Sequence, residues 1–297
     1  QPDLISTSDH NIATIRKKNR VKFSDPNPDL RVGETLCFDV VPNPSKTSIT
    51  SETFFANYLL AVDKKSRKPF LHGLTSKSTS EVISAINYIR SQYFSTQAKD
   101  GQSELLPTSR LQADAGTMFT SEEFKDMCTK NNFKLTLAVA KHLEMNSIVE
   151  RTWQSIMYLR NAFLVHGKVD DSATHFALQY ACKVFSVIPV KTLRKEGRLT
   201  TSYELFYGVK PNINRFRVLF CPCVVKKHTY YKTAANGSKV LTETKPLSQR
   251  GFRGIFVGFD DYDSGYSVYI PSLRQVVSSN DVIFDEEFIS ALIQKHQ

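Results

Sequence analysis

Three acidic residues stand where they could bind divalent cations together. Asp39 interrupts an apolar run, Cys37 to Val40, whose composition otherwise predicts a β-strand. Asp114 closes another short apolar run, and Glu150 lies in the first turn of a long helical pattern. Burial of a lone carboxylate is costly unless a metal ion or a partner compensates it. Carboxylates from several elements are suitable ligands for a pair of Mg²⁺ or Mn²⁺ ions.

Each of these acids also has a simpler interpretation. Most Asp and Glu side chains are solvated, and the first turn of a helix favours an acid such as Glu150 for electrostatic reasons alone. The hypothesis of a metal site therefore depends on the three acids as a group. Two cations held by Asp39, Asp114 and Glu150 would clamp the attacking and leaving oxygens of a phosphodiester.

The elements that must position the acids follow from the apolar pattern. Helical spacing predicts helices over Ser80–Tyr93, from Ser121, over Ser147–Val165 and over Asp171–Val187. Short apolar runs between polar turns predict five strands: Thr35–Val41, Phe54–Asp63, Pro69–Leu74, Arg110–Asp114 and Phe133–Val139. This order predicts an α/β fold, a mixed five-stranded sheet flanked by helices, as in ribonuclease H-like catalytic cores.

The chain divides into three parts by composition. Residues 1–32 are polar with a basic run and predict a linker or arm, and residues 33–192 hold the predicted core. Residues 193–297 predict a linker and a small, mostly β domain. Its predicted strands are Phe216–Phe220, Val224–Lys227, Gly254–Gly258, Tyr266–Ile270 and Gln275–Val277.

Composition narrows the class of protein. Of 297 residues, 41% are hydrophobic and 23% charged, as in ordinary globular proteins. No apolar run of about 18 residues is present, which argues against a membrane protein. The five cysteines are odd in number and scattered, so a reducing compartment fits better than a disulfide framework. The chain begins at Gln1 rather than Met, which predicts either a fragment or a protein cut from a longer precursor.

Basic charge favours a polyanionic partner. The formal net charge is +10, and seven Lys and Arg residues against one Glu lie between Val224 and Arg253. These residues predict contacts to DNA phosphates, although a solvated basic hairpin is the alternative. If Glu150 faces a catalytic groove, helical spacing and proximity place three polar side chains near it. The predicted DNA-binding residues are therefore His142, Asn146, Gln154, Lys226, Lys227, Lys232, Lys239, Arg250 and Arg253.

The segments around the acids resemble those of copia-type (Pseudoviridae) LTR-retrotransposon integrases. Residues 115 to 149, thirty-five in all, separate Asp114 from Glu150, as in the D,D-35-E pattern of these enzymes. The matching segments are LCFDV at 36–40, DAGTMF at 114–119 and NSIVER at 146–151. Ala115, Met118 and Ser147 replace the family's usual Asn, Glu and Gly. Beyond the core, TSYELFYGVKP at 201–211, LFCP at 219–222, RGIFVGF at 253–259, GYSVY at 265–269 and DVIFDE at 281–286 are similar to the family's C-terminal region.

This resemblance implies a DNA integrase cut from a Pol polyprotein, which processes the 3′ ends of the element and joins them to target DNA. Asp39, Asp114 and Glu150 would hold two Mg²⁺ or Mn²⁺ ions. The implied partners are element-end DNA, target DNA, further copies of the chain on DNA and other Pol products before processing, with no membrane. The implied location is the nucleus, after a stage in cytoplasmic virus-like particles.

Zinc is not expected in this chain. The family's N-terminal zinc module uses two His and two Cys, whereas here His10 is the one upstream candidate and Cys37 is the first cysteine. A second arrangement, Cys221 and Cys223 with His228, supplies three ligands and no further cysteine pair, so structural cysteines are the favoured interpretation.

Two other functions use the same residues. A ribonuclease H-like nuclease would hydrolyse nucleic acid at the three acids without joining strands. A domesticated or inactive integrase-derived module would bind DNA through its basic residues and show no metal-dependent turnover.

Overall fold

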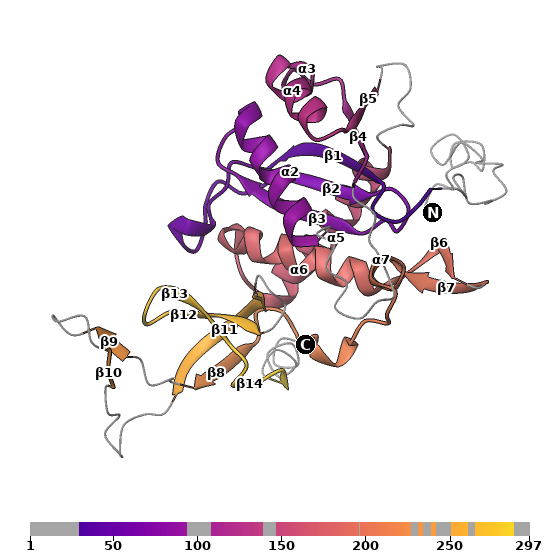
Figure 1. Ribbon diagram of the computed structural model, residues 1–297. Helices are drawn as coiled ribbons and strands as arrows, with labels where there is room; N and C mark the ends of the chain where they lie inside the picture. The colour runs from indigo at the N-terminus through magenta and orange to yellow at the C-terminus, as the bar shows by residue number, and fades with distance from the viewer. Residues whose placement is uncertain are drawn as a thin grey trace, which may run out of the picture.

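The structure of the 297-residue chain is a computed structural model. It describes residues 30–93, 108–138, 147–195, 197–226, 231–233, 239–241, 251–260 and 265–287. The predicted arm of residues 1–32 lies almost entirely outside this described part. Figure 1 shows a helix-covered sheet formed by the N-terminal half, with a second sheet from the C-terminal third beside it.

The first sheet has five strands in the order β3-β2-β1-β4-β5. β2 pairs antiparallel with both β1 and β3, whereas β4 pairs parallel with both β1 and β5. Their bounds are Thr35–Pro42 for β1, Asn57–Asp63 for β2, Pro69–Leu74 for β3, Arg110–Asp114 for β4 and Lys134–Ala138 for β5. This is the ribonuclease H-like arrangement, and it confirms the predicted mixed sheet.

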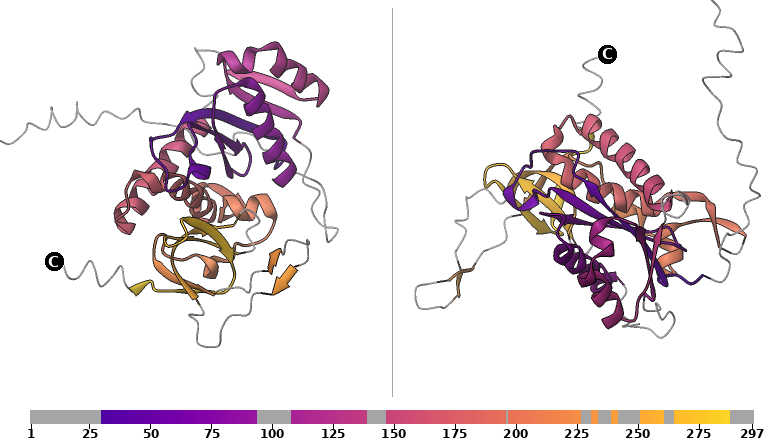
Figure 2. Two further views of the ribbon diagram at one scale, coloured as in Figure 1. Left: turned by 90° about the vertical axis from the view of Figure 1, so that its left-hand side faces the viewer. Right: turned by 90° about the horizontal axis from the view of Figure 1, so that it is seen from above.

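Helices cover both faces of this sheet, as the view from above in Figure 2 shows. One face packs against α2 (Thr79–Tyr93), α3 (Thr117–Thr120) and α4 (Glu122–Lys130), and the other against α5 (Ser147–Gly167) and α6 (Thr174–Val187). β1 supplies both cores because successive side chains point to opposite faces of a strand. Leu36 and Phe38 lie in the α2 core, and Cys37 and Val41 lie in the α5 core.

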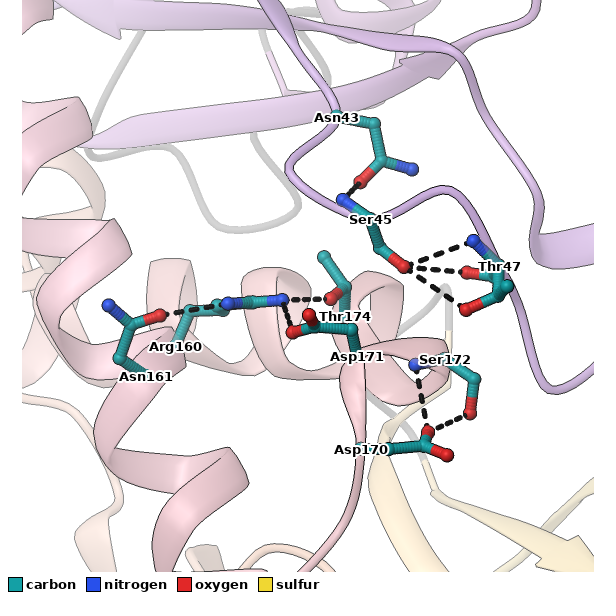
Figure 3. A network of polar contacts seen from close by, with 9 residues as sticks. All are labelled: Asn43, Ser45, Thr47, Arg160, Asn161, Asp170, Asp171, Ser172 and Thr174. Atoms are coloured by element: carbon teal, nitrogen blue, oxygen red, sulfur yellow. Dashed lines mark hydrogen bonds and ion pairs between the residues drawn. The ribbon is translucent and has the colours of Figure 1, made fainter.

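The long helix α5 is tied to the start of α6 by a buried arginine. Arg160 donates hydrogen bonds to Asn161, Asp171 and Thr174 (Figure 3). Asp171 begins the short 3-10 helix η2 (Asp171–Ala173), and Thr174 is the first residue of α6. The guanidinium therefore orients the two helices that form one layer of the core.

The C-terminal region forms a second five-stranded sheet in the order β13-β12-β11-β8-β14, with every pairing antiparallel. Its strands are β8 (Pro222–Lys226), β11 (Gly251–Phe259), β12 (Tyr266–Ile270), β13 (Gln275–Ser279) and β14 (Val282–Phe284). A two-stranded ribbon of β9 (Tyr231–Thr233) and β10 (Lys239–Leu241) is separate from this sheet. The predicted mostly β region is therefore confirmed.

The prediction of a strand over Phe216–Phe220 is wrong. This segment follows η3 (Ile213–Arg215) without strand structure, and Phe220 has a left-handed φ of 66°. An L-residue with that φ interrupts extended backbone. The apolar residues are explained by packing instead, because Phe220 is buried and Phe216 packs against Tyr180.

Two elements between the sheets were not predicted. β6 (Pro189–Lys195) and β7 (Arg198–Thr201) form a hairpin, and α7 (Ser202–Tyr207) follows it directly. Thr201 caps α7 by accepting a hydrogen bond from the Glu204 amide. Gly208 ends the helix in the left-handed conformation, a common use of glycine.

The two sheets share a hydrophobic core across α6. Phe176, Ala177 and Tyr180 of α6 lie in one buried cluster with Phe256 of β11 and Val268 of β12. Tyr180 also donates a hydrogen bond to the Arg217 carbonyl at 2.6 Å and accepts one from the Arg217 amide at 3.1 Å. The C-terminal sheet therefore packs, through α6, onto the first sheet and its helices. The boundaries at 32/33 and 192/193 stay predictions.

We predict that Arg160→Ala destabilises the protein by about 2–4 kcal/mol, because the substitution removes a buried guanidinium and its charged hydrogen bonds. Thermal and urea unfolding measure this loss. Arg151→Ala is the control, since Arg151 is an exposed arginine of the same helix. Equal loss of stability in the two variants would contradict the role given to Arg160.

Candidate active site

The register of β1 and β4 places two of the predicted acids side by side. These parallel strands pair Leu36 with Leu111 and Cys37 with Gln112. Continuing that register by two residues brings Asp39 opposite Asp114, on strands about 4.8 Å apart. Both residues are partly buried. The alternation along β1 directs Asp39 to the face covered by α5.

Local hydrogen bonds orient both aspartates. The Val40 amide donates to Asp39 Oδ1 at 2.7 Å, and the Gly116 amide donates to Asp114 Oδ1 at 3.1 Å. A side chain at Gly116 would crowd this arrangement, because an added Cβ would lie 3.0 Å from Asp114 Oδ1. The glycine after the second acid therefore lets the chain turn closely around the carboxylate.

Glu150 comes to the same region on the first turn of α5. Its neighbour Val149 is buried in the core that contains Cys37 and Val41 of β1. Glu150 itself is exposed. Packing of Val149 therefore fixes the start of α5 over β1 and leaves the glutamate at the rim of the site.

The electrostatics of Asp39 show that the three acids are near one another. Burial raises the pKa of Asp39 from 3.8 to about 6, and the negative charges of Asp114 and Glu150 act in the same direction. The Val40 amide and the positive charge of Lys77 oppose this rise. The sequence pattern did not identify Lys77 as a neighbour of Asp39.

The three carboxylates do not converge on a single point. Among residues 30–93, 108–138, 147–195 and the other described segments, no three His, Cys, Asp or Glu side chains form a group that could hold a metal ion. The donor chemistry nevertheless fits a hard divalent cation, since all three groups offer carboxylate oxygens. A cation would also offset the negative charge that raises the pKa of Asp39.

The predicted DNA-binding residues near Glu150 are only partly described. Gln154 is exposed one turn beyond Glu150 on α5. It lines an open groove of about 530 Å³ with residues of α5, α6 and β6, which include Tyr158, Phe185 and Val190. His142 and Asn146 lie outside the described residues.

Two of the predicted basic residues lie on the exposed face of the C-terminal sheet. Arg253 pairs with Val224, and Lys226 follows two residues later on the same strand as Val224. All three side chains are exposed, whereas Cys223 and Val225 face the core. Lys226 Nζ lies 3.7 Å from an Asp281 carboxylate oxygen. The backbones of Lys232 and Lys239 are in β9 and β10 but their side chains are not described, and Lys227 and Arg250 lie outside the described residues.

The five cysteines are buried and unpaired by disulfides. Burial raises the pKa of Cys221 and of Cys223 to about 12, so both remain protonated thiols at neutral pH. This supports the structural interpretation of the Cys221 and Cys223 pair, while His228 lies outside the described residues.

Comparisons with known proteins match both parts of the chain. Residues 239–296 match the retroviral polymerase SH3-like domain. The chain is 22% identical over 273 residues to the retrovirus-related Pol polyprotein from transposon TNT 1-94 of Nicotiana tabacum. That similarity covers 91% of this chain and 18% of the polyprotein, so the chain spans about a fifth of its relative's length.

Three solved structures that resemble this chain come from retroviruses. The HTLV-2 integrase catalytic core domain in complex with magnesium is 20% identical with a TM-score of 0.43, over 60% of this chain and 98% of that one. The catalytic core domain of BIV integrase is 16% identical with a TM-score of 0.42, over 59% and 95%. A simian T-cell lymphotropic virus intasome in complex with a PP2A regulatory subunit is 16% identical with a TM-score of 0.46, over 86% and 79%.

The topology is that of a ribonuclease H-like fold followed by an antiparallel β region, and the C-terminal part of the chain matches the retroviral polymerase SH3-like domain. The predicted resemblance to a copia-type retrotransposon Pol polyprotein is confirmed by the tobacco transposon relative.

We predict that Asp39→Asn stabilises the metal-free protein by about 1–2 kcal/mol near pH 8. The pKa of Asp39 is about 6 when folded and 3.8 in its ordinary state, so the free energy of unfolding falls as pH rises from about 4 to about 6. Asparagine cannot ionise, so it removes this loss of stability. Its side-chain oxygen can still accept the hydrogen bond from the Val40 amide. The advantage should shrink as the pH is lowered toward 4.

Thermal unfolding with a chelator at both pH values measures this difference. Asp126→Asn, at an exposed position of α4, is the control and should leave the melting temperature unchanged. If Asp39→Asn is no more stable than the unsubstituted protein near pH 8, the ionised Asp39 carboxylate does not destabilise the folded state as predicted.

Proposed function

We propose that this chain is the integrase of a copia-type retrotransposon, which processes the 3′ ends of element DNA and transfers them into target DNA. The observation that carries the proposal is that Asp39 and Asp114 lie on adjacent parallel strands, each two residues beyond the last paired positions, and that Asp114 and Glu150 both act electrostatically on Asp39. The same sheet topology and the SH3-like C-terminal match support it.

The three carboxylates would hold two Mg²⁺ or Mn²⁺ ions, which supply activation of the attacking water or 3′-hydroxyl and charge neutralisation at the phosphorus. Asp39 and Asp114 contribute oxygens from adjacent strand positions, and Glu150 approaches from α5. Most of the rate enhancement in such a reaction comes from positioning and electrostatics. The rigid sheet therefore serves to keep the two aspartates in one place.

DNA would be held by residues of α5 and of the C-terminal sheet. Gln154 extends the site along α5, and Lys226 and Arg253 offer positive charge on the exposed face of the C-terminal sheet. Contacts of this kind bind the phosphate backbone and carry little sequence information. His142, Asn146, Lys227, Lys232, Lys239 and Arg250 complete the proposed DNA-binding set.

The proposed context is a multimer of this chain on paired DNA ends, released from other Pol products and acting in the nucleus after a cytoplasmic particle stage. No helix in the described part of the chain is long and apolar enough to cross a membrane.

We predict that Asp114→Asn abolishes strand joining while the protein stays folded, because one of the three carboxylates that would hold the cations is lost. The assay incubates a 3′-hydroxyl-bearing oligonucleotide duplex with supercoiled plasmid in Mn²⁺ and resolves joined from cleaved products. Asp126→Asn is the matched control and should join at the unsubstituted rate. Joining by Asp114→Asn at that same rate would refute the proposed site.

The same assay separates the alternative functions. A ribonuclease H-like nuclease would shorten the substrate in Mn²⁺ and give no longer products. An inactive DNA-binding module would retain the duplex in a filter-binding measurement and leave it chemically unchanged.

We predict that Mn²⁺ raises the melting temperature of the unsubstituted protein, since a ligand that binds the folded state stabilises it in proportion to the logarithm of its concentration. Chelator should reverse the shift, and Asp39→Asn should reduce it. An equal shift in the Asp39→Asn variant would place the bound cation elsewhere.

A further inference from the structure

A short loop joins β3 to α2 at the edge of the sheet that carries the acids. Leu74, the last residue of β3, pairs with Asn57, and Asn57 pairs with Pro42 at the end of β1. The loop therefore leaves the sheet just beyond the carboxyl end of β1. Asp39 lies three residues before Pro42 on β1, so the loop and Asp39 are near the same edge of the sheet.

Glu81 holds this loop in one conformation. Its carboxylate accepts hydrogen bonds from the amide and hydroxyl of Thr75 at 2.6 and 2.8 Å, and from those of Ser76 at 2.8 and 2.5 Å. Burial opposes ionisation, but these four bonds prevail and lower the pKa of Glu81 to about 2. Ser78 Oγ also accepts from the Glu81 amide at 3.3 Å. The loop is thus fixed by a carboxylate whose oxygens are already engaged.

Lys77 is exposed at the centre of this braced loop. Within the described part of the chain, the Lys77 side chain makes no hydrogen bond or ion pair, and its positive charge acts to lower the pKa of Asp39. A lysine on this hydrogen-bonded loop, close enough to act on Asp39, puts a positive charge at the rim of the candidate site. Lysine ammonium groups bind phosphate oxygens as point charges.

We propose that Lys77 is a positioning residue that holds a non-bridging phosphate oxygen of the DNA strand at the carboxylate site. This inference rests on the proposed integrase function. The three carboxylates and one phosphodiester together carry four negative charges, which two divalent cations would match, and a deprotonated attacking oxygen would add one further negative charge. The Lys77 ammonium at the rim would offset this negative charge and orient the DNA strand.

The first test compares Lys77→Gln, Lys77→Arg and Lys130→Gln in the Mn²⁺ joining assay. Lys77→Gln should slow joining roughly 10- to 100-fold, the effect of losing one charged hydrogen bond. Lys77→Arg should recover part of the rate, because it restores the charge. Lys130→Gln removes an exposed lysine at the end of α4 and should join normally.

The second test neutralises the DNA side of the contact. Duplexes carrying one methylphosphonate at successive positions near the joined end remove one phosphate charge at a time. If Lys77 holds a particular phosphate, Lys77→Gln should cost nothing further on the duplex that lacks that charge, and should keep its full effect on the others. The thermal shift given by Mn²⁺ should persist in Lys77→Gln.

Two results would overturn the role of Lys77. One is joining by Lys77→Gln at the unsubstituted rate. The other is a loss of rate that is equal on every duplex and accompanied by loss of the Mn²⁺ thermal shift, which would show that Lys77 acts by neutralising Asp39. Failure of the proposed function is a separate outcome, because it requires Asp114→Asn to remain active.

Discussion

Burial of the Asp39 carboxylate near two other acids is the constraint on which the candidate site depends. Asp39 and Asp114 are held together because β1 and β4 pair in parallel, and these strands are buried between two helical layers. Burial and the charges of Asp114 and Glu150 raise the pKa of Asp39. The folded core therefore disfavours the ionised form of this carboxylate. Local instability of this kind is common where function requires concentrated charge. Here a divalent cation is the natural compensation.

The second constraint is the shared core between the two sheets. Tyr180 of α6 packs edge-on against Phe256 and also hydrogen-bonds the backbone of Arg217, so apolar and polar contacts join the same surfaces. α6 also packs against α5, which carries Glu150. The exposed face with Lys226 and Arg253 therefore has a defined orientation relative to the acids. Under the proposed function, this would fix the position of these two basic residues relative to the carboxylates.

Packing explains where sequence patterns misled. Phe216–Phe220 has the apolar composition of a strand, but Phe220 adopts a left-handed φ and is buried in the cluster that joins the two sheets. α7 is only six residues long and shows no helical period, so its cap at Thr201 and the Gly208 stop were the available signals. Lys77 is one lysine among many in the sequence, and only the braced β3–α2 loop distinguishes it.

The sequence by itself determined the alternation of β1, the strand order along the chain and the identity of the three acids. These are local properties, because side-chain period and residue type are set by neighbours in the chain. Tertiary structure decided which positions meet. The parallel register sets Asp39 beside Asp114, Val149 anchors Glu150 above them, and pairing through β2 carries the Lys77 loop to the same edge. Such contacts join residues tens of positions apart, and only long-range strand pairing and helix packing bring them together.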